Sequence, residues 1–187
     1  AVRLNLALKT TRIGQLFAQT GRSSSEPATW EGLELFLGQQ VPFADPRLKT
    51  VYANFAANLA DIADQGRQAG AKVVFTTVPV NLRDCPPFAS RHRPGLRADE
   101  LAEWEKDFAS GQKAEDAGRF DEALADYGKA AQIDNQFAQL IFQRAGCELA
   151  LKQAAPAETD FQRARDLDTL RFRSDSRINE IIRQVAA

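Results

Sequence analysis

The sequence of 187 residues lacks methionine altogether and contains only one histidine and two cysteines. Because position 1 is not methionine, we expect either a processed terminus or, as the preferred interpretation, a segment taken from a longer protein. Cys85 and Cys147 are too few for a disulfide framework, and no Cys/His cluster has the spacing of a zinc site. We expect two buried thiols, no metal and no cofactor, and the redox compartment stays open.

An excess of basic charge is also lacking, since 24 Lys and Arg residues face 25 Asp and Glu residues. A general nucleic-acid binder needs such an excess to neutralise phosphates. No apolar run approaches the roughly 18 residues of a membrane-spanning helix. The sequence therefore predicts no nucleic-acid partner and no membrane span, and it does not indicate a cellular compartment.

Catalytic signatures are missing as well. The chain has no G-x-S-x-G elbow, P-loop, G-x-G-x-x-G or H-E-x-x-H motif. His92 is the single candidate for an imidazole general base, and Ser90 and Asp84 are near it in sequence. Nothing places Ser90 on a sharp strand-to-helix turn, so we expect His92 to be a solvated loop residue and the chain alone to have no catalysis.

What the chain does contain is an internal repeat of 34 residues. Pairs at this offset match in size and polarity: Gly111 with Ala145, Ala123 with Ala157, Tyr127 with Phe161, Ala130 with Ala164, Ile133 with Leu167, and Asp134 with Asp168. One helical hairpin cannot bury its own apolar face and must stack on a neighbour. The repeat therefore predicts two stacked helix-turn-helix units.

Apolar spacing predicts helices across this region, from about 98 to a break at Gly118, then over 120–132, 137–152 and 155–167. A last helix is expected over 174–186, with an apolar stripe that includes Ile178, Ile181 and Ile182. We expect this closing helix to cover the open face of the second hairpin, as terminal helices do in repeat arrays.

The front half predicts helices over 2–19 and from Pro27, and a stronger helix that starts with Asp45 as N-cap and ends at Gly66 or Gly70. The run KVVFTTV, about 72–78, is the single predicted strand and suits a position covered on both faces. A lone strand leaves main-chain groups unpaired. We expect either that its neighbours belong to the rest of an α/β domain or that a dimer partner or a distant edge completes it.

Polar residues follow the predicted strand. Asn81, Arg83 and Asp84 stand where ligands bind in open α/β sheets, and an amide with a forked cation suits an oxyanion or a carboxylate. The alternative is that these residues only stabilise a proline-rich turn. Further arginines near the end of the chain alternate with acidic residues, which favours an ion-paired surface over an anion site.

Residues 104–171 resemble two tandem tetratricopeptide (TPR) units, carried by GQKAEDAGRFDEALADYGKAAQID and AGCELALKQAAPAETDFQRARDLD. The resemblance implies a groove for a protein or peptide partner, lined by the first helix of each hairpin and by the closing helix. Its implied lining is Phe108, Gln112, Glu115, Gln139, Phe142, Gln143, Arg173 and Arg177. TPR clamps for C-terminal carboxylates use Lys and Asn where this chain has Phe108, Gln112, Phe142 and Gly146, so that ligand is not implied.

The flanks VYANFAANLADIADQGRQAGAKVVFTTVPVNLRDCPPFAS and DLDTLRFRSDSRINEIIR resemble the interior of an SGNH (GDSL-type) hydrolase-like protein. Such proteins can carry a TPR pair as an insertion. The family's serine block and its Asp/His block have no counterpart here, so the resemblance assigns no catalytic residue. Asn81, Arg83 and Asp84 would form at most part of a substrate rim.

The fold we predict is mostly α, with an α/β remnant over 1–97 and a TPR domain over 98–187. The predicted function is a partner-binding scaffold. One alternative is a non-catalytic interior part of an ester hydrolase. Another is a purely structural module whose groove is filled by Leu16, Phe17, Trp30 and Phe36. Two repeats and an unpaired strand also favour a homo-oligomer.

Overall fold

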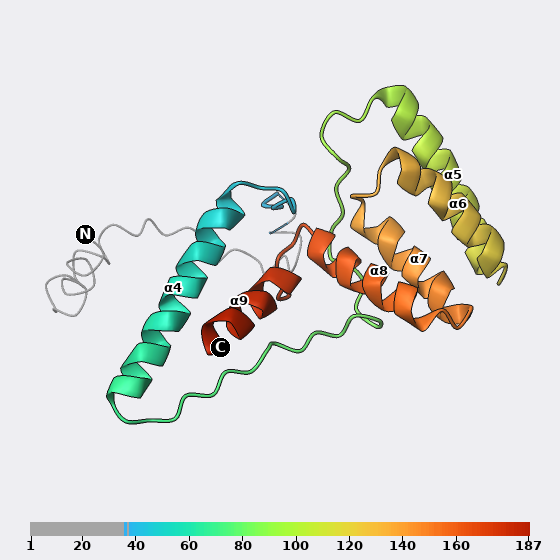
Figure 1. The fold of residues 1–187 in the computed structure, drawn as a ribbon. Helices are drawn as coiled ribbons and strands as arrows, with labels where there is room; N and C mark the ends of the chain where they lie inside the picture. The colour runs from blue at the N-terminus through green and yellow to red at the C-terminus, as the bar shows by residue number, and fades with distance from the viewer. Residues whose placement is uncertain (1–35, 37) are drawn as a thin grey trace, which may run out of the picture. The chain divides into compact units, whose positions relative to one another are not determined.

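A computed structural model describes Phe36 and residues 38–187, which belong to one compact unit (Figure 1). Its helices are α4 (Arg47–Gln68), α5 (Ala98–Asp116), α6 (Phe120–Ile133), α7 (Ala138–Ala150), α8 (Ala154–Leu167) and α9 (Ser176–Ala186). The predicted helices over 2–19 and from Pro27, together with Leu16, Phe17 and Trp30, lie outside the described residues.

The described residues are mostly helical, which confirms the α class of the prediction. The predicted strand over 72–78 is wrong. Residues 71–82 are extended but form no ladder with any other described segment. A strand is defined by main-chain pairing, and the described chain offers this run no partner. The α/β remnant predicted for 1–97 is therefore represented, in its described part, by a helix and an extended segment.

Helix α4 starts and ends as its local sequence dictates. The Asp45 carboxylate accepts the N–H of Arg47 at 2.9 Å, and Pro46 precedes the first helical residue. At the other end Gly70 has φ +75°, a left-handed conformation that glycine adopts at little cost. Of the two predicted stops, Gly70 is therefore the one used, while Gly66 lies inside the helix.

The four central helices form two hairpins, α5 with α6 and α7 with α8, and α6 also packs on α7. The turn of each hairpin contains one left-handed residue, Gly118 at φ +72° and Lys152 at φ +62°, and these are 34 residues apart. The N–H of the next residue, Arg119 or Gln153, donates in both turns to a carbonyl five residues back at 2.9 Å. The two hairpins thus turn in the same way.

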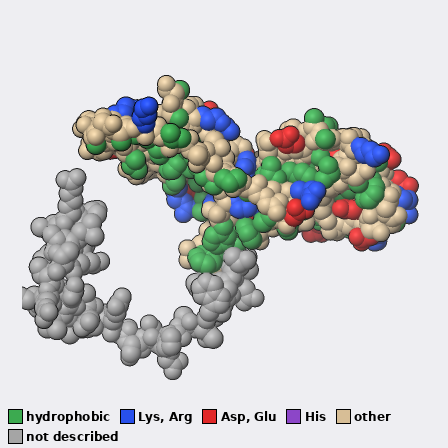
Figure 2. All heavy atoms as spheres, turned by 90° about the horizontal axis from the view of Figure 1, so that it is seen from below, with side chains coloured by type: hydrophobic (Ala, Val, Ile, Leu, Met, Phe, Trp, Pro, Cys, Tyr) green, Lys and Arg blue, Asp and Glu red, His purple; other side chains and the backbone are tan. Residues whose placement is uncertain are grey.

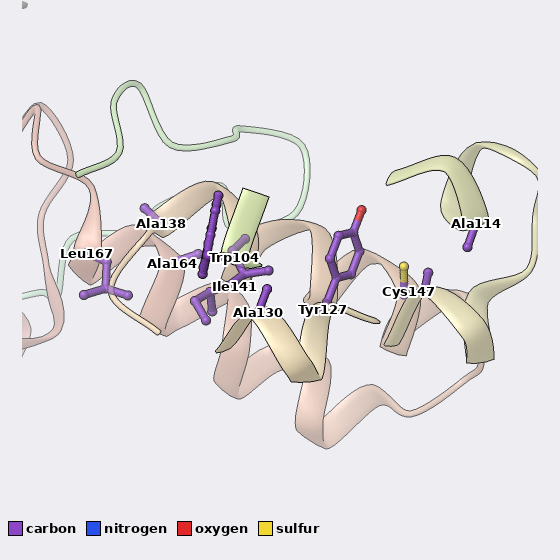
Figure 3. Close-up of a cluster of buried hydrophobic side chains, with 11 residues drawn as sticks. Trp104, Ala114, Tyr127, Ala130, Ala138, Ile141, Cys147, Ala164 and Leu167 are labelled. Atoms are coloured by element: carbon purple, nitrogen blue, oxygen red, sulfur yellow. The ribbon is translucent and has the colours of Figure 1, made fainter. Parts of the chain in front are cut away.

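Buried side chains between the helices also follow the 34-residue offset (Figure 3). Tyr127 on α6 is fully buried, and a Cβ on Gly111 would lie 2.5 Å from its ring. Phe161 on α8 is buried in a cluster with Ala145 and Ala157. Where the first hairpin has tyrosine against glycine, the second has the slimmer phenylalanine beside alanine. Small and large residues therefore exchange volume at equivalent positions.

Helix α9 packs mainly on α4, and its first residue, Ser176, is hydrogen-bonded to Arg165 and Asp166 of α8. The prediction that α9 covers the open face of the second hairpin is therefore wrong. Its Asp175 N-cap accepts the N–H of Ile178 at 3.0 Å and is hydrogen-bonded to the Tyr52 hydroxyl on α4. The side chain packed against the Ala145–Ala157–Phe161 cluster comes instead from Leu82, in the extended segment.

Large apolar side chains remain exposed on the described surface (Figure 2). Most of them precede the hairpins in sequence: Phe43, Val51, Ile62, Val74, Val78 and Phe88. The hairpins bury most of their large apolar side chains, whereas α4 and the extended segment after it leave apolar surface uncovered.

Candidate partner-binding surface

Residues 79–94 are hydrogen-bonded to both hairpins at the ends of α6 and α8, and we call this segment the strap. Asp134, at the end of α6, accepts the N–H of Arg93 at 3.1 Å and that of Gln136 at 2.8 Å. Its carboxylate is almost completely buried. A charged acceptor that binds main-chain N–H groups away from water contributes about 1.5–3 kcal/mol per bond.

Asp168, which is 34 residues later at the end of α8, repeats this arrangement. It accepts the N–H groups of Phe88 at 3.0 Å and Ala89 at 3.2 Å from the strap, and the N–H of Leu170 at 3.1 Å. Each aspartate therefore binds the residue two positions ahead of it and also the strap. The strap crosses both hairpins at equivalent places.

His92 is not the solvated residue that the sequence predicts. Its Nδ1 lies 2.8 Å from Asp134 Oδ2, and its side chain is 28 % exposed. The ring stacks on Phe137 and meets Trp104 edge-on, both at 4.6 Å between centroids. Because the carboxylate can only accept, Nδ1 carries the hydrogen. Asp84 and Ser90 do not form a triad with it: Asp84 is paired with Arg83, and the Ser90 hydroxyl accepts the Gln139 N–H at 2.9 Å.

The residues of the predicted groove on α5 and α7 have two kinds of environment. Phe108 stacks on Trp104 with 4.8 Å between ring centroids, and the ring centroid of Phe142 lies 5.3 Å from that of Phe161. Both Phe108 and Phe142 are partly buried at the edge of the core. The side chains of Gln112, Gln139 and Gln143 are partly exposed. This face of α5 and α7 therefore combines aromatic rings with amide groups.

Glu115 on α5 is hydrogen-bonded to α6 and lies beside α7. One of its carboxylate oxygens accepts the Tyr127 hydroxyl at 2.5 Å, and the other lies 3.9 Å from where a Cβ on Gly146 would be. Burial and this carboxylate raise the pKa of Tyr127 well above its usual value. Burial also raises the pKa of the nearby Cys147 to about 12, with Glu115 and Glu148 adding to the effect. Both groups stay protonated at neutral pH.

Two arginines predicted for the groove lie elsewhere. Arg173 donates to the Cys85 carbonyl at 2.6 Å and to Asp168 at 3.0 Å, so it fastens the strap. Arg177 is paired with Glu180 at 2.6 Å on the exposed side of α9. None of these contacts of Arg173 and Arg177 involves a residue of α5 or α7.

The predicted substrate rim is a turn. The Asn81 amide oxygen accepts the N–H of Asp84 at 2.9 Å, and Arg83 pairs with Asp84 at 2.8 Å. All three residues are exposed. Without a sheet beneath them, they stabilise the proline-rich turn, which is the alternative that the sequence left open.

Two pockets lie away from the face of α5 and α7. One of about 430 Å³ lies near the end of α8, with Phe43, Gln136, Arg163 and Asp166 in its wall. Another, of about 340 Å³, is lined by α4, α9 and residues 171–175. Apart from Arg173 in the second, no residue of the predicted groove lines these two pockets.

No group of three or more His, Cys, Asp or Glu side chains is placed to hold a metal ion in the part of the chain that the structure describes. Within the same residues, no helix combines the length and the apolar character needed to cross a membrane. Sequence reasoning missed Asp134 and Asp168 as strap-binding residues. Their recurrence at the 34-residue offset was the signal, since a buried acid that recurs at a helix end needs donors.

Comparison of the chain with protein-family models, with curated proteins and with solved structures finds no match in any of the three.

Proposed function

We propose that the two hairpins, α5–α6 and α7–α8, are TPR-type repeats and that the chain is a scaffold module that binds a protein or peptide partner. The observation that carries the proposal is the equivalence of residues 34 apart: Gly118 and Lys152 in the turns, Tyr127 and Phe161 in the packing, and Asp134 and Asp168 at the strap. Helical repeats that stack in this way expose the first helix of each hairpin on a shared face.

The proposed binding surface is the face of α5 and α7 that carries Phe108, Gln112, Gln139, Phe142 and Gln143. Partly buried rings supply apolar contact area, and the amides can donate to and accept from a peptide main chain. The Gln143 side-chain oxygen is buried and accepts no hydrogen bond from the described residues.

A selection from a random peptide library displayed on phage tests the proposal. Enriched peptides are synthesised, and their affinity for the chain is measured by fluorescence anisotropy. We expect Gln143→Arg or Gln112→Arg to weaken binding by about tenfold or more, because a long cation then occupies the face. Circular dichroism checks that each variant keeps its helices.

The matched control is Gln132→Arg, on an exposed position of α6. This variant should bind the same peptides with unchanged affinity. If no peptide is enriched, or if all three glutamine variants bind alike, the proposed surface is wrong.

A second candidate is that the chain is the interior of an SGNH hydrolase-like protein, to which it contributes structure and no catalytic group. The observation that favours it is the order of α4, Gly70 and the apolar extended run 72–78, which suits a piece of an α/β domain. A p-nitrophenyl ester should show no turnover above buffer with this chain. A rate abolished by Ser90→Ala or His92→Ala would contradict this assignment.

A further inference from the structure

The extended segment 72–78 is fixed near both of its ends. Val73 packs on α4 so closely that a Cβ on Gly66 would lie 2.5 Å from its Cγ2 atom. At the other end, the Asn179 amide on α9 pairs with both main-chain groups of Val78: it accepts the N–H at 2.8 Å and donates to the C=O at 3.0 Å. The Asn179 side chain thus forms both main-chain hydrogen bonds that a neighbouring strand would make to Val78.

Between these anchors the main chain is unpaired. Among the residues that the structure describes, the N–H and C=O groups of residues 72–77 make no hydrogen bond. From residue 72 to residue 76 the side chains alternate in exposure as in a strand: Val73 and Phe75 are partly buried, while Val74, at 83 % exposure, and Thr76 face outward. Thr77, the next residue, is exposed as well. The segment is therefore held in the shape of a strand without a neighbour.

We propose that residues 72–78 pair with the same segment of a second copy of the chain, forming a two-stranded antiparallel ladder across a two-fold axis. Main-chain groups in an extended row are best satisfied by another extended polypeptide, so the unpaired edge itself defines the class of partner. The described chain contains no strand to offer, whereas a second copy brings an identical pre-ordered edge.

Asn179 determines which edge is free. The groups of Val78 point to α9, and in a strand those of residues 74 and 76 point the same way. Residues 73, 75 and 77 therefore present the other edge. An antiparallel ladder centred on Phe75 makes hydrogen-bonded pairs of Phe75 with Phe75 of the second copy and of Val73 with Thr77.

Charge permits this register. Lys72 is the single charged residue of the segment, and in the proposed pairing it lies opposite Val78, so no like charges meet. The formal net charge of −1 adds little repulsion between copies. The exposed Val74 side chains of the two copies lie near one another on the outer face of the ladder, which removes apolar surface from water.

The test combines molar mass by light scattering with hydrogen exchange of the full chain over a range of concentrations. The expected result is a concentration-dependent dimer in which the amides of residues 73, 75 and 77 gain protection. Thr77→Pro removes a donor from the ladder and should raise the dimer dissociation constant by about tenfold or more. Thr76→Pro is the matched control: it places the same ring one residue earlier, with its nitrogen on the other edge, and should dimerise like the unchanged chain.

Three results would overturn the proposal. A monomer at every concentration is one, and a dimer whose 73–77 amides exchange freely is the second. The third is equal behaviour of the two proline variants. None of these results bears on peptide binding by α5 and α7, so this inference and the proposed function can fail separately.

Discussion

At the scale of single residues, Asp134 and Asp168 have the same structural role, one in each hairpin. Each is buried at the end of a second hairpin helix and binds main-chain N–H groups of the strap. Neither acid lies on the face of α5 and α7 that we propose for binding. Their role is to fix the strap and the helix ends, which positions that face.

Asp168→Ala should lower the free energy of unfolding by about 3 kcal/mol, because it leaves buried N–H donors and the Arg173 guanidinium without their acceptor. Urea denaturation followed by circular dichroism measures the change. The control Asp61→Ala, on an exposed position of α4, should change it by less than about 0.5 kcal/mol. Equal effects of the two substitutions would contradict the role of Asp168.

Two glycines in neighbouring helices should respond in opposite ways to alanine. Gly111→Ala places a Cβ 2.5 Å from the Tyr127 ring and should cost about 1–3 kcal/mol by overpacking. Gly128→Ala meets no atom within 4 Å inside α6 and should stabilise by about 0.5–1 kcal/mol. Thermal unfolding of both variants measures the change in stability. If Gly111→Ala leaves the stability unchanged, α5 and α6 do not cross at this position.

Glu148 should make the chain less stable as pH rises. Burial, together with the charge of Asp160, raises its pKa, and its Oε2 is a buried acceptor without a hydrogen-bond donor among the described residues. A carboxyl whose pKa is higher in the folded state adds stability when protonated, and this stability is lost as pH rises through the folded pKa. Glu148→Gln should therefore raise stability at pH 7 by up to about 1 kcal/mol and flatten its decline between pH 4 and 7. Urea titrations at several pH values would show the opposite slope if the carboxylate is stabilised by folding.

At the scale of elements, the two hairpin turns are equivalent, but only one has glycine at the left-handed position. Lys152 has φ +62° where the first turn has Gly118. A non-glycine residue pays about 1 kcal/mol or more for this conformation. Lys152→Gly should therefore stabilise the chain by up to about 1 kcal/mol, and Gly118→Lys should destabilise it by a similar amount. Chemical denaturation of both variants checks this, and loss of stability in Lys152→Gly would contradict the turn geometry.

The helices could be predicted from sequence because their signals are local. Gly70 and Gly118 mark helix ends, and apolar spacing marks each buried face. Local sequence could not show whether residues 72–78 form a strand, because a strand requires a neighbouring strand to pair with. β-branched residues favour the extended conformation but do not supply that neighbour. The position of α9 was also wrong, because its isoleucine stripe fits α4 as well as it fits a hairpin.

The surface residues were partly predictable for the same reason. Phe108, Gln112, Phe142 and Gln143 were predicted from the repeat and the helix period, and their role in binding stays a prediction. Arg173 and His92 were misplaced because their partners, Asp168 and Asp134, are distant in sequence. The repeated aspartate at positions 134 and 168 indicates two equivalent hydrogen-bond acceptors. It does not show which residues of the strap supply the donors.

At the scale of the whole molecule, the described chain has two parts that differ in how completely they bury their apolar side chains. The hairpins bury their large side chains and carry the strap at one end. The part made by α4, α9 and residues 71–78 leaves apolar side chains exposed and main-chain groups unpaired. Peptide binding is what we propose for the first part, and pairing between copies is what we propose for the second.

The central claim is that a partner binds the face shared by α5 and α7. The most direct test is a ¹⁵N–¹H correlation spectrum of the chain, titrated with a peptide enriched in the library selection. We predict that the shifted amides lie on α5 and α7, around Gln112 and Gln143. Shifts confined to α4, α9 or residues 72–78 would contradict the claim.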